Sequence, residues 1–348
     1  MLKKNGFSDI QIGALTDRTA EEIRQIRKER NLKPVYKVVD TCAGEFTAET
    51  PYSYSTYEST HDITPLDGPK VMILGGGPNR IGQGIEFDYC CVQAVYGLRE
   101  AGYKSIMVNC NPETVSTDFD LADRLYFEPI TFEDIMNIIE FEKPDGVLVQ
   151  FGGQTPLKIA EQLTNEGVKI FGTSSASIDL AENREEFARI IKKLKIQIPE
   201  YCIAKNYEEI INFSEIAQFP VLVRPSYVLG GRAMQIVYNK EQLVDYVFRS
   251  AEATNDHPIL IDQFIENAFE FDVDALCDGE EVFIAGIMQH IEEAGVHSGD
   301  SSCVLPPYDM SNKVKEDIID MTTKLALELN VVGSVSYTHL TLPTTPYV

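Results

Sequence analysis

Apolar runs alternate with helical segments over residues 69–175, and this alternation constrains the fold more than any other feature of the chain. Four apolar runs have the composition of buried strands, at 71–74, 105–108, 146–149 and 168–171. Helical patterns follow the first three of these runs: over 84–101, over 132–142, and from the stretch 152–156 to Glu166. Because this order is typical of a doubly wound parallel sheet, we expect an α/β domain over residues 63–175.

Glycine-rich loops follow two of the expected strands, GGGPNRIGQG at 75–84 and GGQTP at 152–156. Ligands of such sheets meet the carboxyl ends of strands, so both loops are expected at a binding edge. A dinucleotide is one candidate, but the glycine spacing fits GxGxxG only loosely. The second strand also ends in Asn109 instead of an acidic residue, so we expect no dinucleotide there. Arg80 in the first loop is a candidate contact for a phosphate or a carboxylated intermediate, and the sequence does not decide between them.

A second landmark is the stretch FPVLVRPSYVLGGRAM, residues 219–234. Its apolar beginning predicts a buried strand that ends at Arg224, and a loop with Gly230 and Gly231 follows. Backbone without Cβ atoms can lie against another molecule, and an arginine beside free backbone N–H groups suits a polyphosphate. We interpret the stretch as a phosphate-binding flap; a strand, a turn and a solvated arginine form the plainer alternative.

The surroundings of this flap predict an α+β unit over residues 176–333. Helical patterns cover 175–195, 207–216 and 240–252. Strand patterns cover 201–204, 220–224, 234–237, 259–265, 270–277 and 282–288. Asp278-Gly279 between the last two strands is a tight-turn pair, which predicts a hairpin and an antiparallel sheet.

Composition excludes several classes of function. With a net charge of −24 we expect neither a nucleic-acid surface nor binding to an anionic membrane, and bound anions would need local arginines. The seven cysteines are odd in number and include no CxxC, which favours reduced thiols over disulfides or zinc. We interpret Cys90 and Cys91 as helix core. No apolar run approaches about 18 residues, so a cytoplasmic protein is expected.

The N-terminal region, residues 1–62, is expected to be helical at first and then a connector. Ser8 with Gln11, and Thr19 with Glu22, have the spacing of capping boxes, which predicts two short helices. Residues 36–68 show weak periodicity and are rich in Tyr, Thr, Ser and Pro, so we interpret them as a connector.

Long motifs make the chain resemble the carbamoyl phosphate synthetase large-chain family. They are DTCAGEF (40–46), GGGPNRIGQGIEFDYCC (75–91), NCNPETVSTD (109–118), RLYFEP (124–129), GGQTP, RPSYVLGGRAM and AGVHSGDSSCVLP (294–306). The resemblance extends from about residue 1 to Gly333, and the wording of the motifs favours the second, carbamoyl-phosphate-forming half. It implies the end of a helical oligomerisation domain, a Rossmann-like pre-ATP-grasp domain over 63–175 and an incomplete ATP-grasp domain over 176–333.

The resemblance also assigns roles to single residues. It implies phosphate contacts from Arg184, Arg224, Gly230 and Gly231, adenine contacts from Gln263 and Ile265, a ribose contact from Glu270, and further nucleotide contacts from Gly295, Val296, His297 and Ser298. Arg224 and His297 are the expected catalytic residues. Plainer interpretations remain: Arg184 as a surface arginine, Glu270 as a solvated carboxylate and His297 as a loop histidine.

The last 15 residues, 334–348, depart from the family. They resemble translated sequencing-adapter sequence, and we interpret them as a non-native tail, with a genuine divergent end as the alternative. The family places a metal-holding Gln where this chain has Thr338, and its Glu and Asn ligands lie beyond Val348. We therefore expect no metal ligands in the chain, no strand after residues 313–332 and an exposed apolar side there.

By resemblance, the parent protein is an ATP-dependent ligase. It would make carbamoyl phosphate from bicarbonate, ammonia and two ATP, with Mg²⁺ or Mn²⁺, and this half would phosphorylate carbamate. A small glutaminase subunit would supply the ammonia, and the helical domain could support an oligomer. The pathway served, arginine or pyrimidine synthesis, is not decided by the sequence. The alternatives are another ATP-grasp carboxylase or ligase, such as a biotin carboxylase, and a nucleotide-binding fragment without turnover, which we favour for the chain as given.

Overall fold

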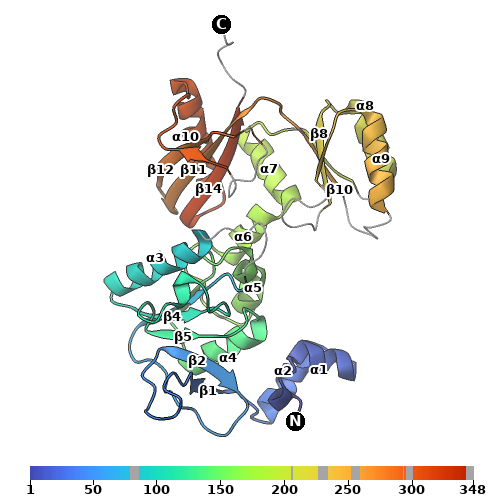
Figure 1. Cartoon of the computed structure of the whole chain (residues 1–348). Helices are drawn as coiled ribbons and strands as arrows, with labels where there is room; N and C mark the ends of the chain where they lie inside the picture. The colour runs from blue at the N-terminus through green and yellow to red at the C-terminus, as the bar shows by residue number, and fades with distance from the viewer. Residues whose placement is uncertain are drawn as a thin grey trace. The chain divides into compact units, whose positions relative to one another are not determined.

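The structure is a computed structural model of the whole chain, and Figure 1 traces it. It describes residues 1–78, 86–204, 207–225, 234–251, 259–292, 294 and 301–341, without the side chains of 184–185, 207, 224–225, 247–251 and 341. The chain forms two compact units that divide between Ile178 and Asp179.

The first unit is built on a six-stranded sheet in the order β1-β2-β5-β4-β3-β6. Its strands are β1 (Val35–Val38), β2 (Tyr52–Thr56), β3 (Lys70–Leu74), β4 (Lys104–Val108), β5 (Arg124–Tyr126) and β6 (Gly146–Leu148). All neighbours run parallel except β1 and β2. All five residues of β3 are buried, because parallel sheets carry helices on both faces.

Helices cover both faces of this sheet, as the sequence predicts for a doubly wound domain. Helix α3 (Glu86–Glu100) packs on one face through Cys91, Val92 and Val95. Helices α4 (Phe132–Glu142) and α5 (Gln154–Asn165) pack on the other face. Short 3-10 turns occur at η1 (Lys3–Asn5) and η2 (Val115–Thr117).

Cys91 is fully buried as expected, but Cys90 is exposed, so the prediction of a core role is wrong for Cys90.

The N-terminal helices form as predicted. Helix α1 (Asp9–Thr16) and helix α2 (Ala20–Glu29) each begin with a complete capping box. The Ser8 hydroxyl accepts from the Gln11 N–H at 3.2 Å, and the Gln11 side chain accepts from the Ser8 N–H at 2.9 Å. Thr19 and Glu22 repeat the arrangement, so local sequence is sufficient to start both helices.

Two expectations for the first unit need correction. The segment interpreted as a connector contributes β1 and β2 to the sheet, and β2 pairs in parallel with β5. The expected strand at 168–171 is reduced to a single bridge between Val147 and Ile170. In both cases long-range pairing, which leaves little periodic signal in short segments, decides the outcome.

The second unit contains two four-stranded sheets. The sheet β7-β10-β8-β9 consists of β7 (Tyr201–Ala204), β10 (Ile259–Gln263), β8 (Val221–Pro225) and β9 (Gln235–Val237), and it is antiparallel. Helices α8 (Tyr207–Ile216) and α9 (Lys240–Ala251) cover one of its faces (Figure 1). These bounds agree with the expected α+β pattern.

The other sheet has the order β13-β12-β11-β14. Its strands are β13 (Cys303–Val304), β12 (Val282–His290), β11 (Phe269–Asp278) and β14 (Val332–Thr341). The predicted hairpin is present as β11 and β12. Helix α7 (Arg184–Leu194), which follows α6 (Ser175–Glu182), and helix α10 (Asn312–Glu328) supply the apolar side chains that pack on this sheet.

Strand β14 corrects the expectation of a missing strand. It pairs with β11 over ten residues, from Val332 opposite Asp278 to Thr341 opposite Phe269. Val335 and Tyr337 pack against the cores that include α10, so the apolar side of that helix is covered.

Among the described residues, no helix has the length and apolar character needed to cross a membrane.

Candidate functional site

Strand β11 separates an apolar face from an acidic face. Alternate residues point to opposite sides of a strand. Phe271 and Val273 enter the core with Ile318 of α10, whereas Glu270, Asp272 and Asp274 alternate with them and belong to the other face. We call the set Glu270, Asp272, Asp274 and His290 the acidic face. Three carboxylates in five residues of one strand are unusual for a simple structural hairpin.

Asp272 lies at the centre of the acidic face, where three strands meet. His290 Nε2 of β12 lies 2.8 Å from Asp272 Oδ2, and both side chains are buried. The Thr338 hydroxyl of β14, directly opposite in register, donates to Asp272 Oδ1 at 2.6 Å. Both carboxylate oxygens are therefore engaged, which fixes the orientation of Asp272 and of the imidazole.

Glu270 completes a group that could hold a cation. Its Oε1 lies 3.9 Å from His290 Nδ1, and Glu270, Asp272 and His290 each offer a ligand atom within 4.8 Å of the others. Two carboxylates and an imidazole match Mn²⁺ better than Mg²⁺, which prefers oxygen alone. The sequence-based analysis missed Asp272 and His290, although the alternation FDVD in the hairpin was a usable signal.

The segment between β10 and β11 carries three of the predicted nucleotide contacts. Gln263 ends β10, where its N–H donates to the Glu200 carbonyl at 2.7 Å, and Phe264 N–H donates to the Pro220 carbonyl at 2.9 Å. Ile265 follows, half-buried, and Glu270 lies at the start of β11. The structure therefore joins Gln263, Ile265 and Glu270 by one short link between the two sheets of the second unit.

The predicted arginines are placed by their backbone only. Arg224 lies in β8 opposite Leu260 of β10, one strand away from the link, and Arg184 opens α7. Their side chains lie outside the described part of the chain. Arg80, Gly230, Gly231, Gly295, Val296, His297 and Ser298 lie outside the described residues altogether.

Glu292, just after β12, is hydrogen-bonded to Ser301 and Ser302, on the other side of the AGVHSGD motif in sequence. Its carboxylate accepts from the Ser301 hydroxyl at 2.8 Å and from the Ser302 N–H at 2.6 Å. The hydrogen bond from the Ser301 hydroxyl holds the pKa of the Glu292 carboxyl below its ordinary value. Glu292 is a third residue that sequence reasoning missed, and its hydrogen bonds join the end of β12 to the residues that precede β13.

The carboxyl edge of the parallel sheet is closely packed in its described part. A Cβ on Gly152 would lie 2.5 Å from the Leu74 carbonyl oxygen, and one on Gly75 would lie 2.6 Å from Asn109 Nδ2. Asn109 is buried and donates to Ser116 Oγ at 3.1 Å. These glycines therefore permit contacts between neighbouring strand ends, whatever else the edge binds.

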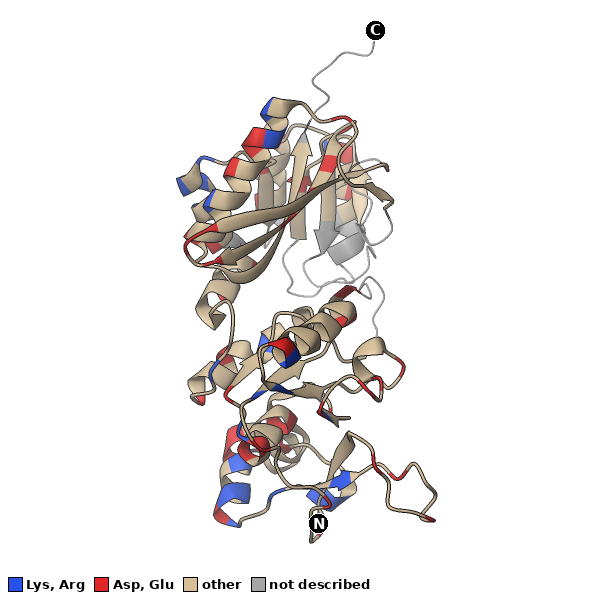
Figure 2. Ribbon diagram, turned by 90° about the vertical axis from the view of Figure 1, so that its left-hand side faces the viewer, with Lys and Arg blue, Asp and Glu red and all other residues tan. Residues whose placement is uncertain are grey.

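Acidic positions recur along the ribbon of both units (Figure 2), in keeping with 54 acidic and 30 basic residues in the chain. The net negative charge of the chain would repel an anionic ligand, so such a ligand would need nearby cations and N–H groups to hold it.

Two family models match the chain in tandem. Residues 67–180 match the carbamoyl phosphate synthase pre-ATP-grasp domain, and residues 183–345 match the ATP-binding domain of the carbamoyl-phosphate synthase L chain. The chain belongs to the carbamoyl phosphate synthase large-chain family. The second match includes the link, the acidic face and β14, and it continues past Gly333 to residue 345.

Curated relatives agree with this family. The large chain from Archaeoglobus fulgidus is 60% identical over 334 residues, which are 96% of this chain and 31% of the relative. The Pasteurella multocida large chain is 58% identical and the one from Haemophilus ducreyi 55%, with 95% and 100% of this chain covered. The chain thus spans about a third of the length of these relatives.

Solved structures show the ATP-grasp fold. The biotin carboxylase domain of Hydrogenobacter thermophilus 2-oxoglutarate carboxylase, in complex with MgADP, ADP and bicarbonate, has a TM-score of 0.61 at 18% identity. That alignment covers 78% of this chain and 60% of the other. Campylobacter jejuni biotin carboxylase has the same TM-score at 15% identity, over 78% of this chain and 62% of the other. At such identities the likeness concerns the fold alone.

Proposed function

We propose that the second unit binds ATP, as part of a ligase that makes carbamoyl phosphate, and that this half phosphorylates carbamate. The observation that carries the proposal is the link from Gln263 to Glu270, which leads from one antiparallel sheet to an acidic face on the next, inside the residues that match an ATP-binding domain. Such a link can offer backbone groups to adenine at one end and a carboxylate to ribose hydroxyls at the other.

In this proposal the protein supplies position and charge neutralisation. Transfer of a phosphoryl group develops little covalent chemistry in the protein, so rate depends on aligned phosphates and on cations around them. Arg224 at the end of β8 and the Gly230-Gly231 flap would hold the phosphates, as the resemblance implies, and His297 would contact the nucleotide. The ammonia would come from a small glutaminase subunit of the whole protein.

A divalent ion would be held differently in this chain than the family pattern implies. The hydroxyl of Thr338, where the family has a metal-holding Gln, already donates to Asp272. With Glu270 assigned to the ribose hydroxyls, Asp272 beside His290 is the carboxylate of this described group that remains for Mg²⁺ or Mn²⁺. A divalent ion held there would supply positive charge that offsets the charge of the phosphates. We propose that the chain binds nucleotide weakly and turns it over poorly, if at all.

The test is calorimetric titration of MgADP into the parent chain and into the variant Glu270→Gln. Loss of the charge-assisted hydrogen bonds to ribose should weaken binding about tenfold or more. The matched control is Glu280→Gln, an exposed carboxyl in the turn of the same hairpin, which should bind like the parent chain. Equal affinity in Glu270→Gln and the parent chain would contradict the assignment of Glu270.

The alternative of a biotin carboxylase has weaker support. Its structural relatives share 15–18% identity, against 55–60% for the carbamoyl phosphate synthase large chains. A chain that binds nucleotide without turnover remains the second candidate. At the position in β14 where the resemblance implies a metal-holding Gln, this chain offers only the Thr338 hydroxyl, which donates to Asp272. Formation of carbamoyl phosphate from ATP, bicarbonate and ammonia by this chain would exclude that second candidate.

A further inference from the structure

Helix α3 presents an outer face without charge. Residues 89–98, YCCVQAVYGL, include no Asp, Glu, Lys or Arg, whereas 24% of the whole chain is charged. Cys91 and Val95 pack on the sheet, and the opposite side of the helix is exposed. Two large side chains project from that side, Tyr89 at 59% exposure and Tyr96 at 44%. Exposed apolar side chains that gather in this way mark a surface for contact with another molecule.

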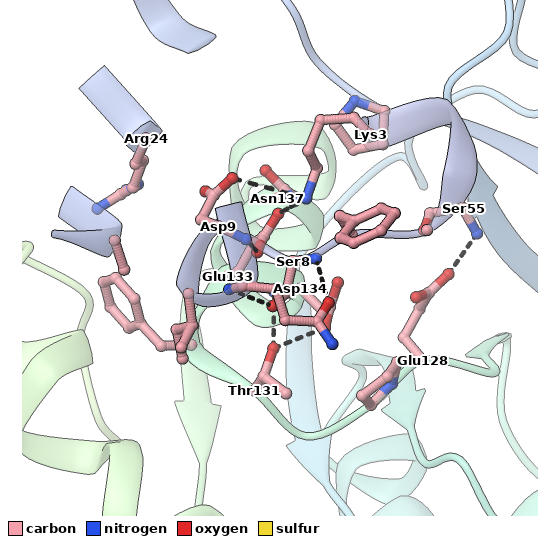
Figure 3. A pocket seen from close by; sticks show the side chains of 18 of the residues that line it. Lys3, Ser8, Asp9, Arg24, Ser55, Glu128, Thr131, Glu133, Asp134 and Asn137 are labelled. Atoms are coloured by element: carbon pink, nitrogen blue, oxygen red, sulfur yellow. Dashed lines mark hydrogen bonds and ion pairs between the residues drawn. The ribbon is translucent and has the colours of Figure 1, made fainter. Parts of the chain in front are cut away.

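Two other surfaces of the first unit carry a mixture of charges. The wall of the cavity beside the N-terminal helices includes Lys3, Glu133 and Asp134 (Figure 3), and Lys3 pairs with Glu133. Helix α5 exposes Lys158 and Glu161. The uncharged face of α3 is therefore a local feature of this helix.

A neighbouring segment extends the face of α3. Hydrogen bonds hold the segment around η2 along the helix: the Ser116 N–H donates to Asp88 at 2.8 Å, and Arg99 donates to a backbone carbonyl further along the segment. Phe119 in this segment is 57% exposed. We call these exposed residues the α3 face: Tyr89, Cys90, Gln93, Tyr96, Gly97 and Phe119.

The α3 face is complementary to itself. Tyr89 and Tyr96 lie on one side of Gln93, because successive residues of a helix are about 100° apart. Cys90 and Gly97 lie on the other side. A Cβ on Gly97 would meet no atom within 4 Å beyond its own helix, so the surface there is hollow. Two parallel copies of α3 about a two-fold axis at Gln93 would place each tyrosine opposite the small residue that follows it in sequence.

Charge restricts what could cover this face. The chain has a net charge of −24, so two copies come into contact most readily where both surfaces lack carboxylates. Glu86 and Glu100 stand at the two ends of the helix, where crossing helices diverge. A basic partner would find no carboxylate to pair with between these ends. A second copy, in contrast, offers the same uncharged surface with the matching shape.

We propose that the α3 face joins two copies of this chain in a two-fold symmetric dimer. Tyr96 of each copy would pack into the hollow at Gly97 of the other, and the Gln93 amides would meet at the axis. The surface belongs to the first unit and uses no residue of the proposed nucleotide site, so its test does not depend on nucleotide binding.

The size of the face predicts a weak dimer. Tyr89, Tyr96 and Phe119 are each about half exposed, and a side chain of this kind has about 200 Å² of surface, so the three would bury about 300 Å² per copy. Stable interfaces bury about 800 Å² per partner. We therefore expect a dissociation constant in the micromolar range.

The test is sedimentation velocity of the chain over the micromolar range of concentration. We expect a species of twice the mass of one chain, populated further at high salt, which screens the repulsion between the copies. Gly97→Gln fills the hollow and should weaken association about tenfold or more. The matched control is Ala14→Gln, a small exposed residue of α1, which should associate as the parent chain does.

Cross-linking tests the position of the axis. Gln93→Cys brings the thiols of two copies together at the axis, so mild oxidation should give a disulfide-linked dimer. The matched control is Glu161→Cys, an exposed position of α5, which should cross-link more slowly. The parent chain, in which Cys90 is exposed, gives the background rate.

A thermal melt at a concentration where the parent chain is monomeric separates lost association from lost folding. Glutamine is a better helix former than glycine, so Gly97→Gln should melt no lower than the parent chain. A monomer at every concentration, parental association in Gly97→Gln, or equal cross-linking in Gln93→Cys and Glu161→Cys would each overturn the proposal. A dimer lost in Ala14→Gln would also overturn it, because the contact would then be the apolar side of α1.

Discussion

At the scale of single residues, protonation of Glu128 makes the free energy of unfolding depend on pH. Burial raises its folded pKa to about 7, above the ordinary value of 4.5, so the folded state binds the proton more tightly than the unfolded state. The stabilisation that this proton provides is complete below about pH 4.5 and is lost as the pH rises through 7. We expect the free energy of unfolding to fall by up to about 3 kcal/mol from this source.

The variant Glu128→Gln tests that expectation. Glutamine keeps an oxygen acceptor for the Ser55 N–H and cannot ionise, so the variant should lose stability less steeply than the parent chain between pH 5 and pH 8. Urea unfolding at both pH values measures the difference, with Glu113→Gln as an exposed control. Identical pH dependence in the variant and the parent chain would show that Glu128 does not carry the effect.

Arg224 is the single cation that the proposed function needs most. Its position at the end of β8 next to β10 agrees with a phosphate contact. Arg224→Ala should weaken MgATP binding by about 1.5–3 kcal/mol, because it removes a charge-assisted pair. Arg189→Ala, an exposed residue of α7 paired with Glu186, is the control and should bind as the parent chain does. Unchanged ATP affinity in Arg224→Ala would refute the role.

At the scale of elements, buried ion pairs attach the N-terminal helices to the parallel-sheet domain. Asp9 at the start of α1 is held by Arg27 of α2, and its N–H donates to Glu133 of α4 at 2.7 Å. Asp9 and Arg27 are 2% and 6% exposed, so neither charge can be satisfied by bulk water. Residues 1–62 therefore pack as part of the first unit in this structure.

This attachment can be measured by a pair of variants. Asp9→Leu alone leaves Arg27 buried beside Glu133 only, and should lower the free energy of unfolding by about 3 kcal/mol. The double variant Asp9→Leu with Arg27→Met replaces the pair by apolar groups and should be more stable than the single variant. A double variant that is less stable than the single variant would contradict this account of the interface.

Elements with strong local signals were predictable from sequence, and those set by long-range pairing were not. The capping boxes of α1 and α2 and the Asp278-Gly279 hairpin depend on neighbours in sequence, and they form as predicted. Strands β1, β2 and β14 depend on distant partners, so the sequence suggested a connector and a missing strand. Within the site, Glu270 followed from resemblance, but the bond between Asp272 and His290 required the register of β11 and β12.

At the scale of the whole molecule, the chain combines a parallel-sheet unit with a second unit whose last described strand is β14. The non-native origin of residues 334–348 stays a prediction. If the tail is non-native, β14 occupies the place of the family's strand beside β11 but does not carry the family's metal ligands. Its Thr338 offers only a neutral hydroxyl.

Replacement of residues 334–348 by the corresponding segment of the Archaeoglobus fulgidus relative, extended through its next strand, tests this implication. We expect faster Mg²⁺-dependent ATP hydrolysis by the replaced chain than by the original chain, because the resemblance implies that the family's metal ligands lie in the replaced segment. A coupled assay for ADP release measures both. Equal rates in the two chains would contradict the assignment of the missing ligands.

The most direct test of the central claim is a crystal structure of the chain with bound MgADP. We predict adenine against residues 263–265, ribose hydroxyls at Glu270 and phosphates towards Arg224. Nucleotide density at the carboxyl edge of the parallel sheet, beside Gly75 and Asn109, with none at Glu270, would contradict the claim.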